Sequence, residues 1–130
     1  MPWVEVFVVF YVSHLVGDYM LQTEWQALHK HGGLAGPALN RRALSAHIAT
    51  YTLAFVPALI WLFKSVHGGV FAVAAAVAIP HFIQDDGTLL AGYALKVKKA
   101  DIRANPSLAR ALDQSFHVLA LFIVAVVAGV

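Results

Sequence analysis

Histidine and aspartate occur in pairs, four residues apart, at three places in this sequence. The three pairs are His14 with Asp18, His81 with Asp85, and Asp113 with His117. Residues four apart lie on one face of a helix, one turn from each other, so each pair forms a local group. Imidazole and carboxylate together are suitable ligands for a divalent metal ion and suitable groups for proton transfer.

Other polar residues extend these groups. His47 lies at the start of an apolar segment, Gln22 continues the face of the first pair by one turn, and Gln114 follows an acid of the third pair. The predicted metal ligands are His14, His47, His81, Asp113 and His117. The predicted general bases are Asp18 and Asp85, and the predicted further members of the polar cluster are Gln22 and Gln114.

The elements that must position these groups are apolar. Of the 130 residues, 60% are hydrophobic and 12% are charged, whereas a soluble domain usually carries about 25% charged residues. There are no cysteines, which excludes disulfides, thiolate metal ligands and thiol catalysis. This composition predicts an integral membrane protein.

Four apolar segments are each long enough to cross a bilayer as a helix of about 20 residues. They cover about residues 3–21, 44–63, 70–90 and 112–130. We therefore predict an all-α fold, a four-transmembrane-helix bundle that forms one membrane domain over residues 1–130. Nothing in the sequence resembles a nucleic-acid-binding pattern.

The loops between these segments predict the orientation. Residues 22–43 and 96–111 hold eight of the nine Lys and Arg residues, and the turn after the second segment holds only Lys64. Basic loops stay in the cytoplasm, so both termini are predicted on the non-cytoplasmic side.

A short internal repeat indicates how the bundle is built. The segment from Ser13 to Asp18 resembles the segment from Pro80 to Asp85, and Arg42-Ala43-Leu44 resembles Arg110-Ala111-Leu112. The repeat favours two helical hairpins in the same orientation, related by an axis along the membrane normal.

The His and Asp residues then fall at a similar depth, near the cytoplasmic ends of all four helices. A carboxylate within a span costs about 2.5–3.5 kcal/mol and needs compensation. A bound divalent metal of the Zn, Mn or Fe type would supply it. Structural His–Asp hydrogen bonds between helices are the alternative.

Several motifs at these positions resemble a family of small bacterial and phage membrane proteins catalogued as domain of unknown function 3307. The matching stretches are residues 14–23, His47 with residues 49–53, residues 81–85 and residues 113–117. The resemblance implies a small multi-pass protein of a bacterial inner membrane and leaves the reaction unassigned. Related small membrane families have been labelled metal-dependent hydrolases, which is an analogy only.

Three functions are compatible with this pattern. The first is a metal-dependent hydrolase that acts on a lipid-like substrate reached from the cytoplasmic leaflet. The second is a transporter or channel subunit for protons or divalent cations, working as a homo-oligomer. The third is a structural protein of a membrane assembly. Because the outer halves of the spans lack comparable polar residues, the sequence favours the hydrolase.

Overall fold

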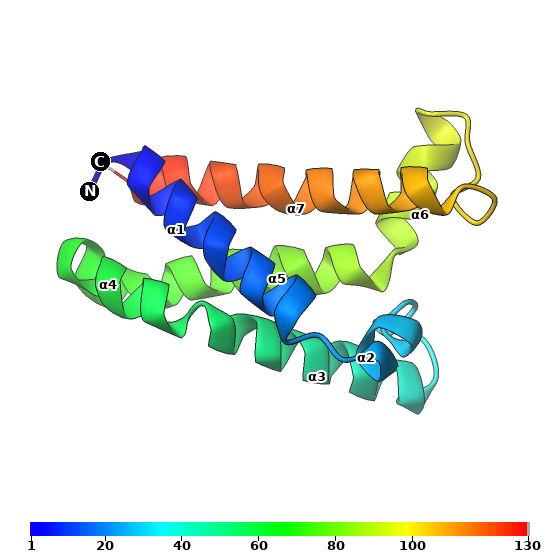
Figure 1. Ribbon diagram of the computed structural model, residues 1–130, viewed down its shortest axis with the longest axis horizontal. Coiled ribbons are helices and arrows are strands. Elements are labelled where there is room, and N and C mark those ends of the chain that lie inside the picture. Colours follow the sequence, from blue (N-terminus) through cyan, green and yellow to red (C-terminus); the bar gives the residue numbers. More distant parts are fainter. Residues whose placement is uncertain (130) are drawn as a thin grey trace.

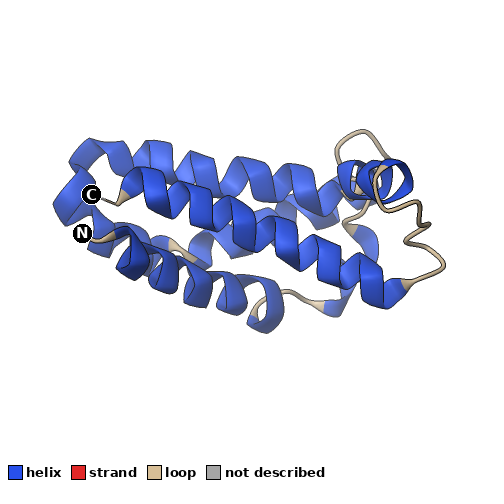
Figure 2. Cartoon of the chain, turned by 90° about the horizontal axis from the view of Figure 1, so that it is seen from above, coloured by secondary structure: helices blue, strands red, loops and turns tan. Residues whose placement is uncertain are grey.

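The computed structural model describes residues 1–129, and within that range the chain is helical with no strand. Figure 1 shows the elements in order, and Figure 2 shows that loops join them mainly at one end of the molecule. The elements are α1 (Trp3–Leu15), a π-helical turn (Val16–Met20), α2 (Glu24–His29), α3 (Ala38–Ala54), α4 (Val56–Val66), a 3₁₀ turn (His67–Gly69), α5 (Val70–Asp86), α6 (Thr88–Lys96) and α7 (Pro106–Ala128).

Long helical segments pack side by side along the molecule. Helices α1 and α5 run in one direction, and α3 with α4 and α7 run back (Figure 1). Helix α1 packs against α7, α7 against α5, and α5 against both α3 and α4. The two ends of the described chain meet at the end of the bundle far from α2 and α6, where Gly129 lies against Trp3.

The second long segment is two helices instead of the single one expected over residues 44–63. Helix α3 ends at Ala54, and Phe55 separates it from α4. Pro57 lies in the first turn of α4 and has no N–H group to continue the hydrogen-bond ladder of α3. The break follows from that missing donor.

The third segment also differs from the expected range of residues 70–90. Helix α5 ends at Asp86 because Gly87 adopts a left-handed conformation with φ of 83°. Glycine takes this conformation without the steric cost of a Cβ atom. Helix α6 then starts at Thr88 as a separate short helix beside the loops (Figure 1).

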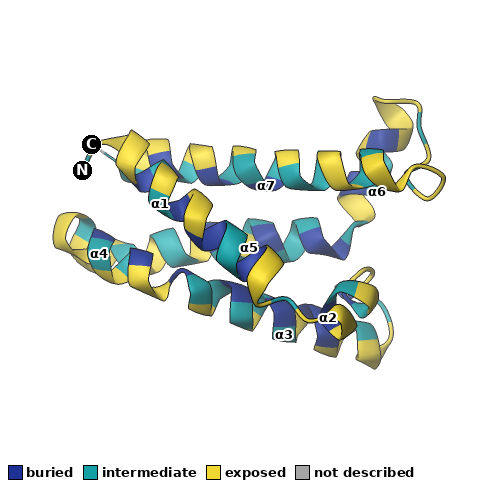
Figure 3. Cartoon of the chain, in the orientation of Figure 1, coloured by how far each residue is buried: buried dark blue, intermediate teal, exposed yellow. Residues whose placement is uncertain are grey.

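Buried side chains divide the bundle into an apolar half and a polar half. The apolar core contains Val6, Phe10, Tyr51, Phe55, Ala58, Leu62, Val77, Leu121 and Ala125. Exposed residues cover the outward faces of the helices (Figure 3), and many of them are large and apolar. Three ranges are long and apolar enough to cross a membrane: Trp3–Met20, Val56–Asp86, which includes the turn at His67–Gly69, and Pro106–Ala128.

Candidate metal centre

A cluster of His and Asp side chains fills the polar half of the bundle. The π-helical turn supplies Asp18, α3 supplies His47, and α5 supplies both His81 and Asp85. All four residues are buried, with exposed fractions of 6% or less. The structure thus brings together one donor side chain from each of three separate segments and a second from α5.

Four atoms of these residues surround one point. Nε2 of His47 lies 3.0 Å from Nε2 of His81 and 2.7 Å from Oδ2 of Asp85. Nε2 of His81 lies 3.1 Å from the same Asp85 oxygen. Oδ1 of Asp18 lies 3.1 Å from Nε2 of His47 and 3.5 Å from Nε2 of His81.

These separations match the edges of a coordination tetrahedron. A metal ion with nitrogen and oxygen ligands at about 2.0–2.1 Å in tetrahedral geometry separates the ligand atoms by about 3.3 Å. The five distances above range from 2.7 to 3.5 Å. Oδ1 of Asp18 is buried and has no hydrogen-bond partner. The donor set therefore fits a divalent ion.

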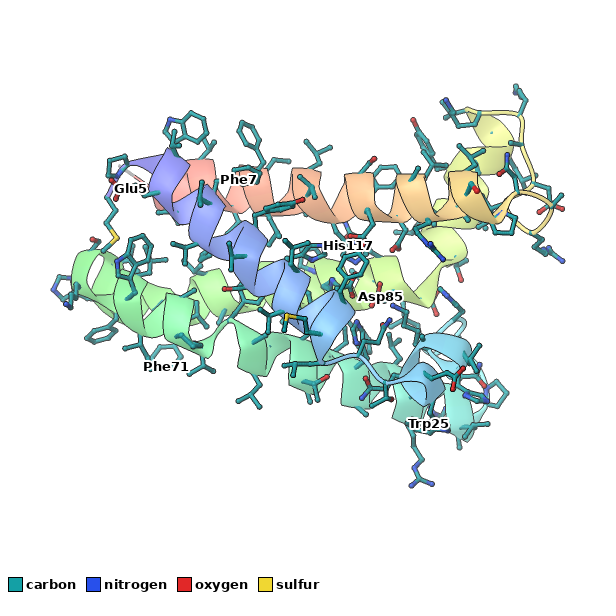
Figure 4. All side chains as sticks on the ribbon, in the orientation of Figure 1. Glu5, Phe7, Trp25, Phe71, Asp85 and His117 are labelled. Atoms are coloured by element: carbon teal, nitrogen blue, oxygen red, sulfur yellow. The ribbon has the colours of Figure 1, made fainter. Side chains whose placement is uncertain are left out.

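Asp85 contacts residues of both α3 and α7, and Figure 4 shows it on α5 near His117. Its Oδ2 accepts a hydrogen bond from Nζ of Lys30 over 3.0 Å, in addition to the contacts with His47 and His81. Its Oδ1 lies 3.1 Å from Nε2 of His117. The two oxygens of one carboxylate thus face two different groups of ligand atoms.

Helix α7 forms the second of these groups. Nδ1 of His117 donates a hydrogen bond to the backbone carbonyl of Asp113 over 2.6 Å, which directs Nε2 toward Asp85. The carboxylates of Asp113 and Asp85 and the His117 ring each offer an atom within 4.8 Å of the others.

His14 lies beside the cluster and is outside both groups of ligand atoms. Its Nδ1 is 2.9 Å from the hydroxyl of Tyr51, and its Nε2 is 2.9 Å from Oε1 of Gln114. The amide of Gln114 donates to Asp18 over 2.9 Å and to Asp113 over 3.2 Å. With Tyr51 as donor to Nδ1, His14 donates to Gln114, and the chain of hydrogen bonds ends on two carboxylates.

The position of Asp18 depends on a local departure from α-helix. A π-helical turn over Val16–Met20 follows α1, and such turns are frequent at functional sites. Gly17 within it packs against Tyr51 so closely that an added Cβ would lie 2.8 Å from Cδ2 of that ring. The glycine therefore permits the close approach of this turn to α3.

Formal charge in the cluster is unbalanced. Asp18, Asp85 and Asp113 bring three negative charges, and Lys30 brings one positive charge when the histidines are neutral. The exposed fraction of the Lys30 side chain is 7%, and its Nζ also donates to Oε1 of Gln22 over 2.7 Å. A single divalent cation would balance the two remaining negative charges.

A cavity of about 1110 Å³ leads from the loop end of the bundle to this cluster. Its walls include Asp18, Lys30, Arg110, Asp113 and Gln114. An apolar groove of about 510 Å³ on α1 and α7 shares Gln114 with the cavity. The groove also includes Phe7, which Figure 4 shows on α1 beside α7.

The family model described as Protein of unknown function (DUF3307) matches residues 6–130. The chain belongs to this family. The resemblance inferred from the His and Asp motifs is therefore confirmed. The comparisons with curated proteins and with solved structures found no match.

Two side chains of this DUF3307 chain were missing from the predicted cluster. Tyr51 follows His47 by four residues, and this spacing, the same as in the His–Asp pairs, could have revealed it. Lys30 carries no such signal, because it reaches the cluster from the end of the short helix α2 and its basic charge is explained equally well by membrane topology.

Proposed function

We propose that this chain is a membrane-embedded, divalent-metal-dependent hydrolase that acts on an amphiphilic substrate from the cytoplasmic side. The observation that carries the proposal is the convergence of Nε2 of His47, Nε2 of His81 and Oδ2 of Asp85 within 2.7–3.1 Å of one another. Two histidines and one carboxylate, with an exchangeable ligand in the fourth position, are typical of catalytic zinc sites and of related iron sites. Oδ1 of Asp18 lies beside that fourth position in this chain.

The buried environment supports a metal ion over a purely structural cluster. Hydrogen bonds between helices would explain His and Asp residues whose polar atoms are all paired. Here Oδ1 of Asp18, Oδ1 of Asp85 and Nε2 of His117 are buried without hydrogen-bond partners. Leaving such groups unsatisfied costs about 1–3 kcal/mol each. A cation held by His47 and His81 would satisfy Oδ1 of Asp18 and reduce the net charge of the whole cluster.

We further propose that the chain crosses the membrane four times. The second apolar range, Val56–Asp86, contains both α4 and α5, and the chain turns back between them at His67–Gly69. The four proposed spans are therefore α1, α3 with α4, α5, and α7. His47 of α3 is buried and faces the cluster, and Arg41 and Arg42 are exposed near the cytoplasmic start of the helix, where headgroups would lie. These three residues lower the hydropathy of the segment. The basic loops at the cavity end support a cytoplasmic cavity and termini on the opposite side.

The cavity and the groove together support an amphiphilic substrate. In the proposal, the polar head occupies the cavity beside Arg110, and the apolar tail lies in the groove on α1 and α7 next to lipid. Gln114, which lines both, marks where head and tail meet.

The roles of the chain's own residues follow from their places. His47, His81 and Asp85 would hold the ion, which would act as a Lewis acid toward the scissile group and toward a water molecule. Asp18 lines the cavity, and its Oδ1 would give up the fourth ligand position to a water molecule and then take the proton of that water. Gln114 and His14 orient Asp18 through its other oxygen. Asp85, which is fully buried, acts as a ligand in this scheme instead of a base.

Transport through the bundle is the weaker proposal. Beyond the cluster, the interior is the apolar core around Phe10, Phe55 and Leu62, which offers an ion no polar path. A one-sided cavity that ends at such a core suits an enzyme.

Metal content and activity of purified protein test the proposal. We expect about one or more equivalents of Zn²⁺, Mn²⁺ or Fe²⁺ per chain, and hydrolysis of amphiphilic esters that stops on chelation and returns with metal. The double variant His47→Ala/His81→Ala should lose both the bound metal and the hydrolytic activity. His67→Asn, at an exposed position in the turn at the opposite end, is the matched control. Wild-type protein that stays metal-free after incubation with these ions would refute the proposal.

A further inference from the structure

We propose that a second divalent cation binds between Asp85, Asp113 and His117, with the Asp85 carboxylate bridging the two ions. The inference rests on the proposed metal centre and specifies its nuclearity. The two oxygens of Asp85 already lie near different histidines, as those of a bridging carboxylate do. Oδ2 lies near His47 and His81, and Oδ1 lies near His117.

The tautomer of His117 supports an ion at this place. Its Nδ1 donates to the Asp113 carbonyl, so in the neutral ring the lone pair lies on Nε2. Metal-binding histidines usually donate their other ring N–H to a carbonyl or carboxylate in this way. Nε2 lies 3.1 Å from Oδ1 of Asp85, which places two electron-rich atoms close together.

An N–H···O hydrogen bond accounts poorly for this contact. Although the two atoms are close, both Nε2 of His117 and Oδ1 of Asp85 are buried without a hydrogen-bond partner. A proton on Nε2 would therefore not point at the carboxylate. An ion with ligands at about 2.0–2.2 Å places neighbouring ligand atoms about 3 Å apart, as these two are.

Asp113 supplies the third ligand and the route of access. Its side chain is 21% exposed and lines the cavity, whereas His117 and Asp85 are buried. The remaining coordination positions of the second ion would therefore face the cavity and a bound substrate.

The net charge of the cluster with two bound ions indicates the substrate class. One divalent ion neutralises the cluster of three carboxylates and Lys30, and a second leaves two positive charges. A phosphate monoester dianion would balance them, and Arg110 lies on the same cavity. Ions about 3.5–4 Å apart clamp the attacking and leaving oxygens in phosphoryl hydrolysis. The favoured substrate is an amphiphile with a phosphate head.

Manganese-loaded wild-type protein gives a direct test. We expect two Mn²⁺ per chain by elemental analysis and an exchange-coupled electron paramagnetic resonance signal. Asp113→Asn/His117→Ala should retain one ion with the six-line signal of isolated Mn²⁺, and Ser115→Ala, on an exposed face of α7, should keep both ions. Inorganic phosphate should bind the two-ion protein at least about tenfold more tightly than the one-ion variant.

The outcomes separate the two proposals. A single uncoupled ion in wild-type protein would overturn the second site and leave the first one standing, and no ion at all would overturn both. Equal phosphate affinity of the one-ion and two-ion proteins would overturn the assignment of the substrate class. The wild-type measurements need no variant, so a variant that fails to fold does not affect them.

Discussion

Replacing Lys30 with methionine should change stability and metal affinity in opposite directions. Lys30 pairs with Asp85 over 3.0 Å, and their side chains are 7% and 0% exposed. Removing one partner of a buried ion pair costs about 3–5 kcal/mol, because the other charge stays buried and unpaired. For a chain of this size, that loss lowers the Tm of the metal-free protein by about 10 °C or more.

Bound metal should restore the stability that metal-free Lys30→Met has lost. Without Lys30, the cluster carries three uncompensated carboxylates, so a divalent cation gains attraction and loses one repulsive neighbour. We expect the variant to bind Zn²⁺ or Mn²⁺ at least about tenfold more tightly than wild type. Saturating metal should therefore raise the Tm of the variant more than it raises the Tm of wild type. The difference between the two increases should follow the logarithm of the ratio of the two metal affinities.

Thermal unfolding in detergent, followed with chelator and across a metal titration, measures both effects. Lys64→Met, at an exposed position on α4, is the matched control and should change neither quantity. If metal-free Lys30→Met has the Tm of wild type, or if metal raises the two values equally, the reasoning about charge in the cluster is wrong.

Three further predictions concern neighbouring residues. Gly17→Ala places a Cβ 2.8 Å from the Tyr51 ring, and we expect a loss of about 1–3 kcal/mol in unfolding assays together with weaker metal binding; unchanged stability would contradict the close contact. Tyr51→Phe removes the hydroxyl that contacts Nδ1 of His14, and it should lower metal affinity about tenfold with a small change in Tm. Phe55→Leu, in the apolar core, should change stability and leave metal affinity unchanged. Metal affinity should fall as pH falls through the acid range, because protons compete with the ion for two imidazoles, and a pH-independent affinity in metal titrations would argue against histidine ligands.

The sequence was sufficient to predict most of the cluster, because helical periodicity acts at short range. Spacing of four identifies residues that share a face, and apolar length identifies the helices that carry them. His81 and Asp85 contact each other as this rule predicts. Convergence between helices is not encoded in spacing, so Lys30 was assigned to the loop charge and its contact with Asp85 was missed.

Helix boundaries were harder to predict, because single residues decide them. Pro57 divides the second apolar segment, and Gly87 ends the helix of the third segment at Asp86, before the expected end at about residue 90. Hydropathy measures transfer into lipid and carries no information on backbone hydrogen bonds or on left-handed conformations. The apolar composition of α6 therefore extended the expected span beyond the point where the chain turns.

The π-helical turn explains why the two similar pairs of the internal repeat have different surroundings. His14 and Asp18 correspond in sequence to His81 and Asp85, and α1 and α5 run in the same direction (Figure 1). Helix α5 stays regular, so its pair meets the ligand atoms of α3 and α7 directly. The π-helical turn changes the register after His14, which leaves that ring bound to Tyr51 and Gln114 and brings Asp18 to the cavity wall. In the proposed function, the copy on α5 holds the ion, and the copy that includes Asp18 acts on the water and substrate that approach it.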